Sequence, residues 1–422
     1  MSDCKARFWK SSYVLSMIKE KYGKTRTSYK LWERGEILEK GDNDMRRLLM
    51  IPGPTNVPVR VMKAMAKPII NHRGTEFNAL YDSILGNLRY AFQTENDVFA
   101  LTSSGTGGVE CAIANIVSKG DRIIVPVNGE FSSRVKENIE KFGGIPIELP
   151  VKWGEAPTVD MIEKALEREK DVSALFVVSN ETSTGTAIKD LAKMGEISKK
   201  HGLLFLVDAI SNLAGDPLPV DKWNVDVCIT CSQKCLACPP GLSLISVSDN
   251  AWKKIQKGTS QSFYFNLLKF KRYLERKETP YTPAIPLYFA LDEGLKMLKE
   301  EGLDNRIVRH EKCARAFYEA IEAIGLELFA VKQYRSNTVI AIKNPKGIDM
   351  NEMRKMMKEK YGIVISGGMG AIRDSIFRIG SMGIVSKREV KATVNALEKS
   401  LSSLGYKFEV GKGIAAVERI LK

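Results

Sequence analysis

The sequence lacks any long apolar run. No stretch of the 422 residues reaches the roughly 18 uninterrupted apolar residues that a membrane-spanning helix needs. The first residues, MSDCKARFWKSSYV, contain no clean apolar segment followed by a small-residue cleavage site, so a secretory signal is not expected. Together these absences predict a soluble, cytoplasmic protein that does not bind a membrane.

Histidine is scarce, and the cysteines do not suggest a disulfide framework. The chain has three histidines and seven cysteines. An odd number of cysteines in a chain of this size argues against disulfide staples. His72 is expected at the edge of an active site, whereas His201 and His310 fall in helical patterns and are expected on helix surfaces.

The charge balance is strongly basic. Lysine and arginine exceed aspartate and glutamate by 64 − 50 = 14, and such an excess can indicate nucleic acid, an anionic membrane or small anionic substrates as partners. The basic residues are scattered along most of the chain, and only residues 263–277 (FYFNLLKFKRYLERK) combine them densely with aromatic residues. We interpret this stretch as a helix or loop with a solvated basic face, and expect no nucleic-acid partner.

Short apolar runs alternate with longer helical patterns from about residue 97. The runs are rich in β-branched residues, as expected for strands that are covered on both faces. This alternation predicts an α/β domain with a mainly parallel sheet, although the last run follows its predecessor closely and could be antiparallel. The expected strands are 98–101, 123–127, 174–179, 203–207, 227–230 and 242–247, and the expected helices are 109–118, 134–142, 161–167 and 191–201.

The pattern changes after about residue 304, where a smaller α+β domain is expected. Its helices should cover 305–324, 351–361 and 387–404, and its strands 337–342, 363–366 and 375–379. The first 44 residues are charged and have no sustained periodicity, so we expect a loosely attached extension or a natural start at Met45. The predicted organisation is an extension (1–44), a large α/β domain (45–303) and a small domain (304–422).

Three features suggest a site for a phosphorylated aromatic cofactor, and the first is a loop of small residues. The strand at 98–101 runs into residues 102–108 (TSSGTGG), and a helix is expected from Val109. Small residues let the backbone approach an anion, and the start of a helix presents free N–H groups to it. The alternative is an ordinary tight turn with a Ser or Thr cap.

The other two features are single residues at strand ends. Asp208 ends the strand at 203–207, where ligands of α/β sheets bind, although it could instead cap a helix. Facing a pyridine nitrogen, its carboxylate would keep that nitrogen protonated. Lys234 lies in the turn after the strand at 227–230 and could reach the same crevice as a nucleophilic amine, although a single lysine is usually a solvated surface residue. In combination, the three features favour the functional interpretation.

With these three features, the chain resembles the class V branch of fold-type I pyridoxal-phosphate enzymes. It is most similar to the alanine–glyoxylate/serine–pyruvate aminotransferase family, from about residue 48 to about residue 401. The resemblance implies the fold of that group, with a large domain around a mainly parallel sheet and a smaller α+β domain. The motifs that carry it are PGPTNVP (52–58), NHRGTEF (71–77), SSGTGGVE (103–110), ETSTG (181–185), VDAIS (207–211), SQK followed by PPG (232–241) and FRIGSMG (377–383).

The resemblance implies pyridoxal 5′-phosphate as the cofactor and assigns roles to residues. Lys234 would bind the cofactor covalently and shuttle a proton, and Asp208 would pair with its ring nitrogen. Arg378 would bind the substrate carboxylate, and Gly53 would line a small substrate pocket. The other residues implied to contact the cofactor are Ser104, Gly105, Thr106, Phe131, Thr182, Ile210 and Gln233.

The resemblance also implies a homodimer with shared active sites. Tyr281 and Thr282 would reach the phosphate of the neighbouring subunit. The chain departs from the family in having Ala284 where a threonine is frequent, so that contact is either missing or taken over by Thr282. Phe131 replaces a common tryptophan, which keeps the stacking surface but removes an N–H donor.

Four cysteines surround the lysine with the spacing C-x2-C-x3-C-x2-C. Taken alone, Cys228, Cys231, Cys235 and Cys238 could bind zinc or an iron–sulfur cluster. Bringing all four onto one metal would distort the turn that must present Lys234. Buried free cysteine behaves as a small hydrophobic residue, so we interpret the four as packing residues and expect no metal.

The function predicted from the sequence is transfer of an amino group from a small amino acid, alanine or serine, to a small 2-oxo acid, glyoxylate or pyruvate. Related alternatives are a 2-aminoethylphosphonate–pyruvate aminotransferase and a cysteine desulfurase. A desulfurase would need a mobile nucleophilic cysteine on a loop of the C-terminal domain, but the only cysteine after Cys238 is Cys313, inside a helical pattern. A basic metal- or nucleic-acid-binding protein built around the cysteine cluster is a more distant alternative.

Overall fold

The structure is a computed structural model that describes residues 47–258 and 260–422. The predictions for residues 1–44 lie outside the described residues. Residues 47–422 form one compact unit. No helix in the described ranges is long and apolar enough to cross a membrane.

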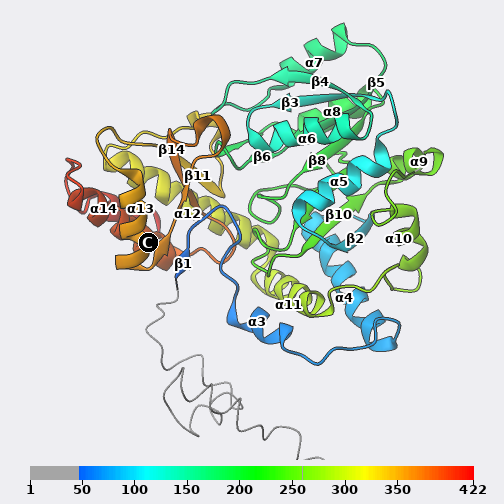
Figure 1. Cartoon of the computed structure of the whole chain (residues 1–422), viewed down its shortest axis with the longest axis horizontal. Coiled ribbons are helices and arrows are strands. Elements are labelled where there is room, and N and C mark those ends of the chain that lie inside the picture. Colours follow the sequence, from blue (N-terminus) through cyan, green and yellow to red (C-terminus); the bar gives the residue numbers. More distant parts are fainter. Residues whose placement is uncertain (1–46, 259) are drawn as a thin grey trace, which may run out of the picture. The chain divides into compact units, whose positions relative to one another are not determined.

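A seven-stranded sheet forms the centre of the large α/β part (Figure 1). All neighbouring strands are parallel except β10, which runs antiparallel to both of its neighbours. The six predicted strands are therefore confirmed, including the antiparallel direction of the last one. The strand order is β2 (Asp97–Thr102), β10 (Leu242–Val247), β9 (Val227–Cys231), β8 (Leu204–Asp208), β5 (Val172–Val178), β3 (Arg122–Val127) and β4 (Ile145–Pro150).

Two hydrophobic cores cover the two faces of this sheet. Along β2, Val98 and Ala100 belong to one core, and Phe99 and Leu101 to the other. Covering on both faces explains the continuous apolar runs in the sequence. One core is packed against α4 (Thr75–Phe92), α7 (Val159–Arg168), α8 (Leu191–Lys200) and α11 (Ile285–Glu301), and the other against α5 (Gly105–Ile116), α6 (Glu130–Lys141), α9 (Asp249–Lys257) and α10 (Leu267–Leu274).

Strand β4 was not predicted from the sequence. It lies at the edge of the sheet and contains Pro146 and Pro150. A proline cannot donate to the ladder, so proline normally argues against a strand and is accepted at an edge. Ile145, the first residue of β4, is exposed, which further weakens the apolar pattern.

A third core lies in the C-terminal part of the chain. The predicted strand at 363–366 is in fact two short strands, β12 (Ile363–Val364), which pairs with β1 (Leu48–Leu49), and β13 (Ser366–Gly367), which pairs with β14. A separate core agrees with a separate domain, but the boundary near residue 304 stays a prediction. The other elements here are α12 (Leu303–Ala323), β11 (Val339–Lys343), α13 (Met350–Tyr361), β14 (Ile376–Gly380), α14 (Lys387–Ser403) and the unpredicted α15 (Lys412–Ile420).

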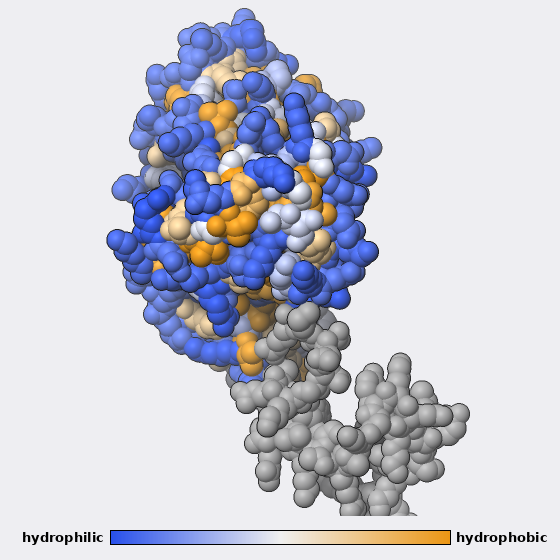
Figure 2. Space-filling view, turned by 90° about the vertical axis from the view of Figure 1, so that its left-hand side faces the viewer, coloured by the Kyte–Doolittle hydropathy of each residue, from blue (hydrophilic) through white to orange (hydrophobic). Residues whose placement is uncertain are grey.

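The smaller elements connect these parts. They are α3 (Val59–Met65), the hairpin of β6 (Asn180–Glu181) and β7 (Thr186–Ala187), and two 3-10 turns, Lys332–Tyr334 and Gly370–Ile372. On the face that Figure 2 shows, hydrophilic side chains predominate and apolar ones gather in a short band.

The prediction that His310 lies on a helix surface is wrong. It lies on α12 and is fully buried, with Nδ1 2.8 Å from the backbone oxygen of Arg306. Burial lowers its pKa to about 3, so the imidazole is neutral at physiological pH. The periodicity of α12 failed as a guide because the polar side of its first half is also covered, by the turn at Cys235 and the segment at Val385.

Candidate active site

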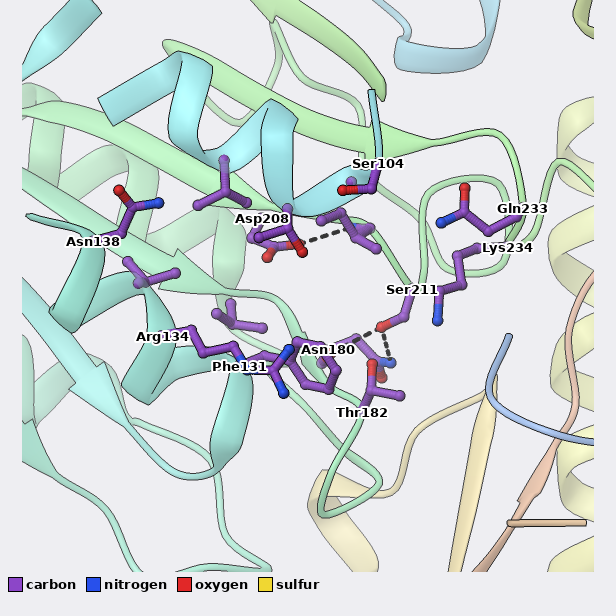
Figure 3. Close-up of a pocket in the computed structure, with 16 residues that line it drawn as sticks. Ser104, Phe131, Arg134, Asn138, Asn180, Thr182, Asp208, Ser211, Gln233 and Lys234 are labelled. Carbon is purple, nitrogen blue, oxygen red and sulfur yellow. Dashed lines mark hydrogen bonds between the residues drawn. The ribbon is translucent and has the colours of Figure 1, made fainter. Parts of the chain in front are cut away.

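One cavity opens at the carboxyl ends of the parallel strands and collects most of the predicted site residues (Figure 3). Side chains from separate segments of the chain, among them Ser104, Asp208 and Lys234, border the same space (Figure 3). This is the position at which α/β sheets bind ligands. The predicted residues that line it are Ser104, Gly105, Thr106, Phe131, Thr182, Asp208, Ile210, Gln233 and Lys234.

The loop between β2 and α5 has the geometry of an anion site. Ser104 caps α5, and its Oγ accepts a hydrogen bond from the N–H of Gly107 at 3.4 Å. A Cβ on Gly105 would lie 2.9 Å from Ile210 Cδ1, so the backbone passes too close to Ile210 for a larger residue. The start of α5 thus presents backbone N–H groups and the positive end of its dipole to the cavity.

Phe131 is held at the cavity by a buried carboxylate. Glu181 is fully buried and accepts hydrogen bonds from the backbone N–H groups of Phe131 at 3.3 Å and Ser132 at 2.9 Å. A carboxylate at the start of a helix is favoured by the helix dipole. The contact fixes the first turn of α6 and hence the aromatic ring, over which the Arg134 guanidinium lies 4.8 Å from the ring centre.

Asp208 is buried at the end of β8. Its Oδ1 accepts a hydrogen bond from the N–H of Ile210 at 2.9 Å. Burial raises the pKa of this carboxyl to about 7, because the charged form loses its hydration. A cation placed beside the carboxylate would favour ionisation, so the site is suited to a positively charged partner such as a protonated ring nitrogen.

The raised pKa of Asp208 leads to a prediction about stability. The unfolded carboxyl ionises near pH 4, but the folded one only near 7. The loss of folding stability caused by ionising this buried carboxyl is therefore absent below pH 4, grows between pH 4 and 7, and stays constant above 7. Asp208→Asn in the cofactor-free protein should unfold with a free energy roughly 2–4 kcal/mol higher than the wild type at pH 8. Urea unfolding at pH 8 and 4.5 measures this, and an equal gain at both pH values would contradict it.

Lys234 lies in the turn after β9, where two segments hold it. Its Nζ donates a hydrogen bond to the backbone oxygen of Pro52, and its backbone oxygen accepts one from Thr55 Oγ1 at 3.2 Å. Burial lowers the pKa of the amine, which raises the fraction present as the neutral nucleophile. A Cβ on Gly53 would lie 2.5 Å from Nζ, so Gly53 forms the wall directly beside the amine.

Arg378 on β14 lies next to the cavity. Its Nη1 donates to the backbone oxygen of Thr182 at 3.0 Å and its Nε to that of Gly367 at 2.9 Å. The side chain is 6% exposed, and burial lowers its pKa to about 10, so the guanidinium stays charged at physiological pH. Nη2 has no hydrogen-bond partner in the described part of the chain, so it is available to bind a carboxylate.

Gly53 and Arg378 lie beside the cavity without lining it, and Tyr281 and Thr282 also do not line the cavity of their own chain. The Tyr281 hydroxyl donates to the backbone oxygen of Phe263 at 2.7 Å, and Thr282 is exposed. Phe263 and Tyr264 next to them are exposed aromatic residues. Contact of Tyr281 with a partner's cofactor stays a prediction.

Several lining residues were missed by the sequence reasoning. Asn180 and Ser211 follow the ends of β5 and β8, and this position was the one signal that could have identified them. The Asn180 amide donates to Ser211 Oγ at 2.7 Å and to Thr338 Oγ1 at 3.1 Å, while its Oδ1 has no partner within the described chain. The remaining missed residues are Val109, Arg134, Val135, Asn138 and Val178.

The four cysteines around Lys234 are all buried free thiols. The Cys235 thiol donates to the backbone oxygen of Ser211 at 3.5 Å, and the Cys238 thiol to that of Leu236 at 3.4 Å. Burial raises the pKa of all four. Among the residues that the structure describes, no group of three or more His, Cys, Asp or Glu side chains is placed to hold a metal ion.

The donor set fits pyridoxal 5′-phosphate. The start of α5 matches the phosphate, Asp208 the protonated ring nitrogen, and Lys234 the aldehyde carbon. Phe131 offers an aromatic face, and the unpartnered Asn180 Oδ1 leaves one acceptor for a polar ligand. Each element of the cofactor therefore has a chemically suitable partner in the cavity.

Comparison with known proteins agrees with this fit. Residues 48–385 match the family model described as Aminotransferase class-V. An uncharacterized aminotransferase of Methanocaldococcus jannaschii is 42% identical, over 90% of this chain and 98% of its own. A Synechococcus protein named soluble hydrogenase, small subunit, is 37% identical, over 89% and 98%.

A solved structure extends the likeness to the fold. The crystal structure of an alanine–glyoxylate aminotransferase from Nostoc sp. superimposes with a TM-score of 0.82 at 34% identity, covering 86% of this chain and 97% of that one. The fold class predicted from the sequence is thus confirmed. The chain belongs to the class-V aminotransferases, and it is a transaminase that depends on pyridoxal 5′-phosphate.

Proposed function

We propose that this aminotransferase moves an amino group from a small amino acid, alanine or serine, to glyoxylate or pyruvate. The contact between Gly53 and Lys234 carries this proposal, because a side chain as small as a methyl group at position 53 would meet the amine at 2.5 Å. So tight a wall beside the reacting lysine favours substrates with short side chains. The name of the Nostoc relative, alanine–glyoxylate aminotransferase, supports the same substrate class.

Three polar residues of the site have roles in this reaction. The bound cofactor supplies an electron sink for the negative charge that develops at the substrate Cα. Arg378 would bind the substrate carboxylate and so fix which Cα bond faces Lys234. Lys234 Nζ would take the proton from Cα as a general base and return a proton as a general acid, for which its lowered pKa suits it. Asp208 would keep the ring nitrogen protonated.

A homodimer with shared active sites is part of the proposal. Tyr281 stays outside the cavity of its own chain and lies 5.2 Å, centroid to centroid, from the stacked ring of Tyr264. Phe263, beside them, is 76% exposed. Exposed aromatic residues gathered in this way are typical of protein interfaces, so they support a second copy of the chain as the neighbour.

We propose the cytoplasm as the location of this protein.

The desulfurase alternative is disfavoured by the position of Cys313. This thiol is buried in α12, and burial raises its pKa to about 11. A nucleophilic cysteine needs an accessible thiolate, which this environment opposes. The 2-aminoethylphosphonate alternative has no comparable observation in its favour.

A panel of amino acids tests the proposed substrate class. We expect alanine, serine and glycine to decrease the absorbance of the lysine-bound cofactor faster than valine, phenylalanine or glutamate do, because Gly53 leaves little room beside Lys234. Glyoxylate or pyruvate should then restore the absorbance, and steady-state kinetics should be ping-pong. The fast donor reactions should also yield the matching 2-oxo acids. Faster reaction of the large amino acids would contradict the proposal.

A further inference from the structure

A half-buried ion cluster lies where α11 meets α12. Glu301 accepts hydrogen bonds from Arg306 Nε at 2.8 Å and from Arg309 Nε at 2.6 Å. Arg306 is 5% exposed, so its charge depends on this partner. Burial alone would raise the pKa of Glu301, but the hydrogen bonds from the two arginines lower it overall. The cluster therefore stays charged at physiological pH and is not part of the cavity.

The cluster reaches the turn that carries Lys234. Arg306 Nη1 points at the backbone oxygen of Cys235, the next residue along the chain, at a distance of 3.5 Å. Because Arg306 Nε donates to Glu301, loss of Glu301 would remove the contact that holds the guanidinium in this direction.

Arg309 reaches the same turn by a second path. Its Nη1 donates to the backbone oxygens of Gly383 at 3.2 Å and Val385 at 2.5 Å. A Cβ on Gly383 would lie 3.3 Å from Ala237 Cβ and 3.1 Å from Thr55 Oγ1. The segment that Arg309 contacts thus lies against both Ala237 of the lysine turn and Thr55.

We propose that Arg306, held by Glu301, is a positioning residue that fixes the backbone of the Lys234 turn at the Cys235 carbonyl. This rests on the proposed role of Lys234. Thr55 Oγ1 donates to the Gln233 and Lys234 carbonyls. The turn is therefore held by polar contacts from Thr55 and from Arg306. Displacing a reacting group by about 1 Å can cost about 100-fold in rate, so even a modest loosening would be visible.

The environment of Lys234 provides a readout that a general loss of stability would not move. Burial is the main cause of its lowered pKa, and the charged or titratable groups that face it are Cys231, Cys235, Asp208 and Arg378. Arg306 is not among them, so removing it would act through the position of the turn. A loosened turn admits water, and the pKa of Lys234 should then rise towards its ordinary value.

The test compares Arg306→Lys and Glu301→Gln with the control Glu322→Gln in the full-length protein. Lysine keeps the charge of Arg306 but lacks the planar fork that serves two partners. Glu322 lies on α12 and pairs with Arg335 at 2.8 Å, and it contacts neither the turn nor the cavity lining. The measurements are kcat and KM for the amino donor with cofactor, and the pH midpoint of Lys234 acetylation by mass spectrometry after cofactor removal.

We expect both test variants to lower kcat by about 10- to 100-fold. They should also raise the acetylation midpoint by about one pH unit. The KM for the donor should stay within about twofold of the wild type, since Arg378 is untouched, and the control should change none of these values. Wild-type kcat and an unshifted midpoint in Arg306→Lys would overturn the proposal, even if Glu301→Gln does not fold. Because acetylation is read without cofactor, it still decides the role of Arg306 if the proposed chemistry of Lys234 fails.

Discussion

Replacing Lys234 by alanine is expected to abolish covalent attachment of the cofactor and almost all transamination. Among residues 47–258 and 260–422, Lys234 is the only lysine that lines the cavity, and it is held there by Pro52 and Thr55. Loss of proton transfer at Cα alone should lower kcat by about 10²–10⁴-fold. The missing covalent bond adds to this, because the incoming amino acid would react with a free aldehyde instead of displacing an amine.

Borohydride reduction followed by peptide mass spectrometry measures the attachment directly. In the wild type, the peptide that contains Lys234 should gain the mass of the reduced cofactor, and in Lys234→Ala no peptide should gain it. Lys222→Ala is a suitable control, because Lys222 is exposed and outside the cavity. A borohydride-reducible cofactor in Lys234→Ala would contradict the assignment, and an unchanged circular dichroism spectrum would show that the variant is folded.

The residues at the centre of the cavity could be predicted because the ends of buried strands can be recognised in the sequence. Asp208 and Lys234 each follow a buried apolar run, and the carboxyl ends of neighbouring parallel strands converge on one crevice. The small residues after β2 were predicted for a similar reason, since they leave space for an anion, although the helix begins at Gly105 and not at Val109, so the glycines form its first turn.

The rest of the cavity lining depends on packing that no local pattern encodes. Asn138 and Val135 reach the cavity because they lie on the side of α6 that faces it, and the sequence of α6 alone does not specify its rotation. The contacts of Arg306 and Arg309, on the same helix as His310, join α12 to segments far away in the chain. Burial created by such long-range contacts is invisible to periodicity, so the sequence placed His310 on the surface.

Replacing Arg378 by leucine is expected to raise the KM for the amino donor by about 100-fold, because the carboxylate loses a charge-assisted hydrogen bond worth about 1.5–3 kcal/mol together with its ionic partner. The effect should fall mainly on substrate binding and orientation. The cofactor should still attach to Lys234, since Arg378 does not line the cavity. Arg378→Lys should recover only part of the loss, because an ammonium cannot also donate to the Thr182 and Gly367 carbonyls in the planar arrangement of a guanidinium.

Steady-state kinetics with alanine and with an amine that lacks a carboxylate separate recognition from general damage. The variant should lose most of the preference for alanine, while the poor reaction with the carboxylate-free amine should be nearly unchanged. Arg373→Leu controls for loss of a positive charge in the same segment, because Arg373 is exposed. If Arg378→Leu slowed both substrates by the same factor, Arg378 would act by supporting the fold around Thr182 and Gly367, and the carboxylate would have to be bound elsewhere. Equal preference for alanine in the wild type and Arg378→Leu is therefore the result that decides against carboxylate recognition by this residue.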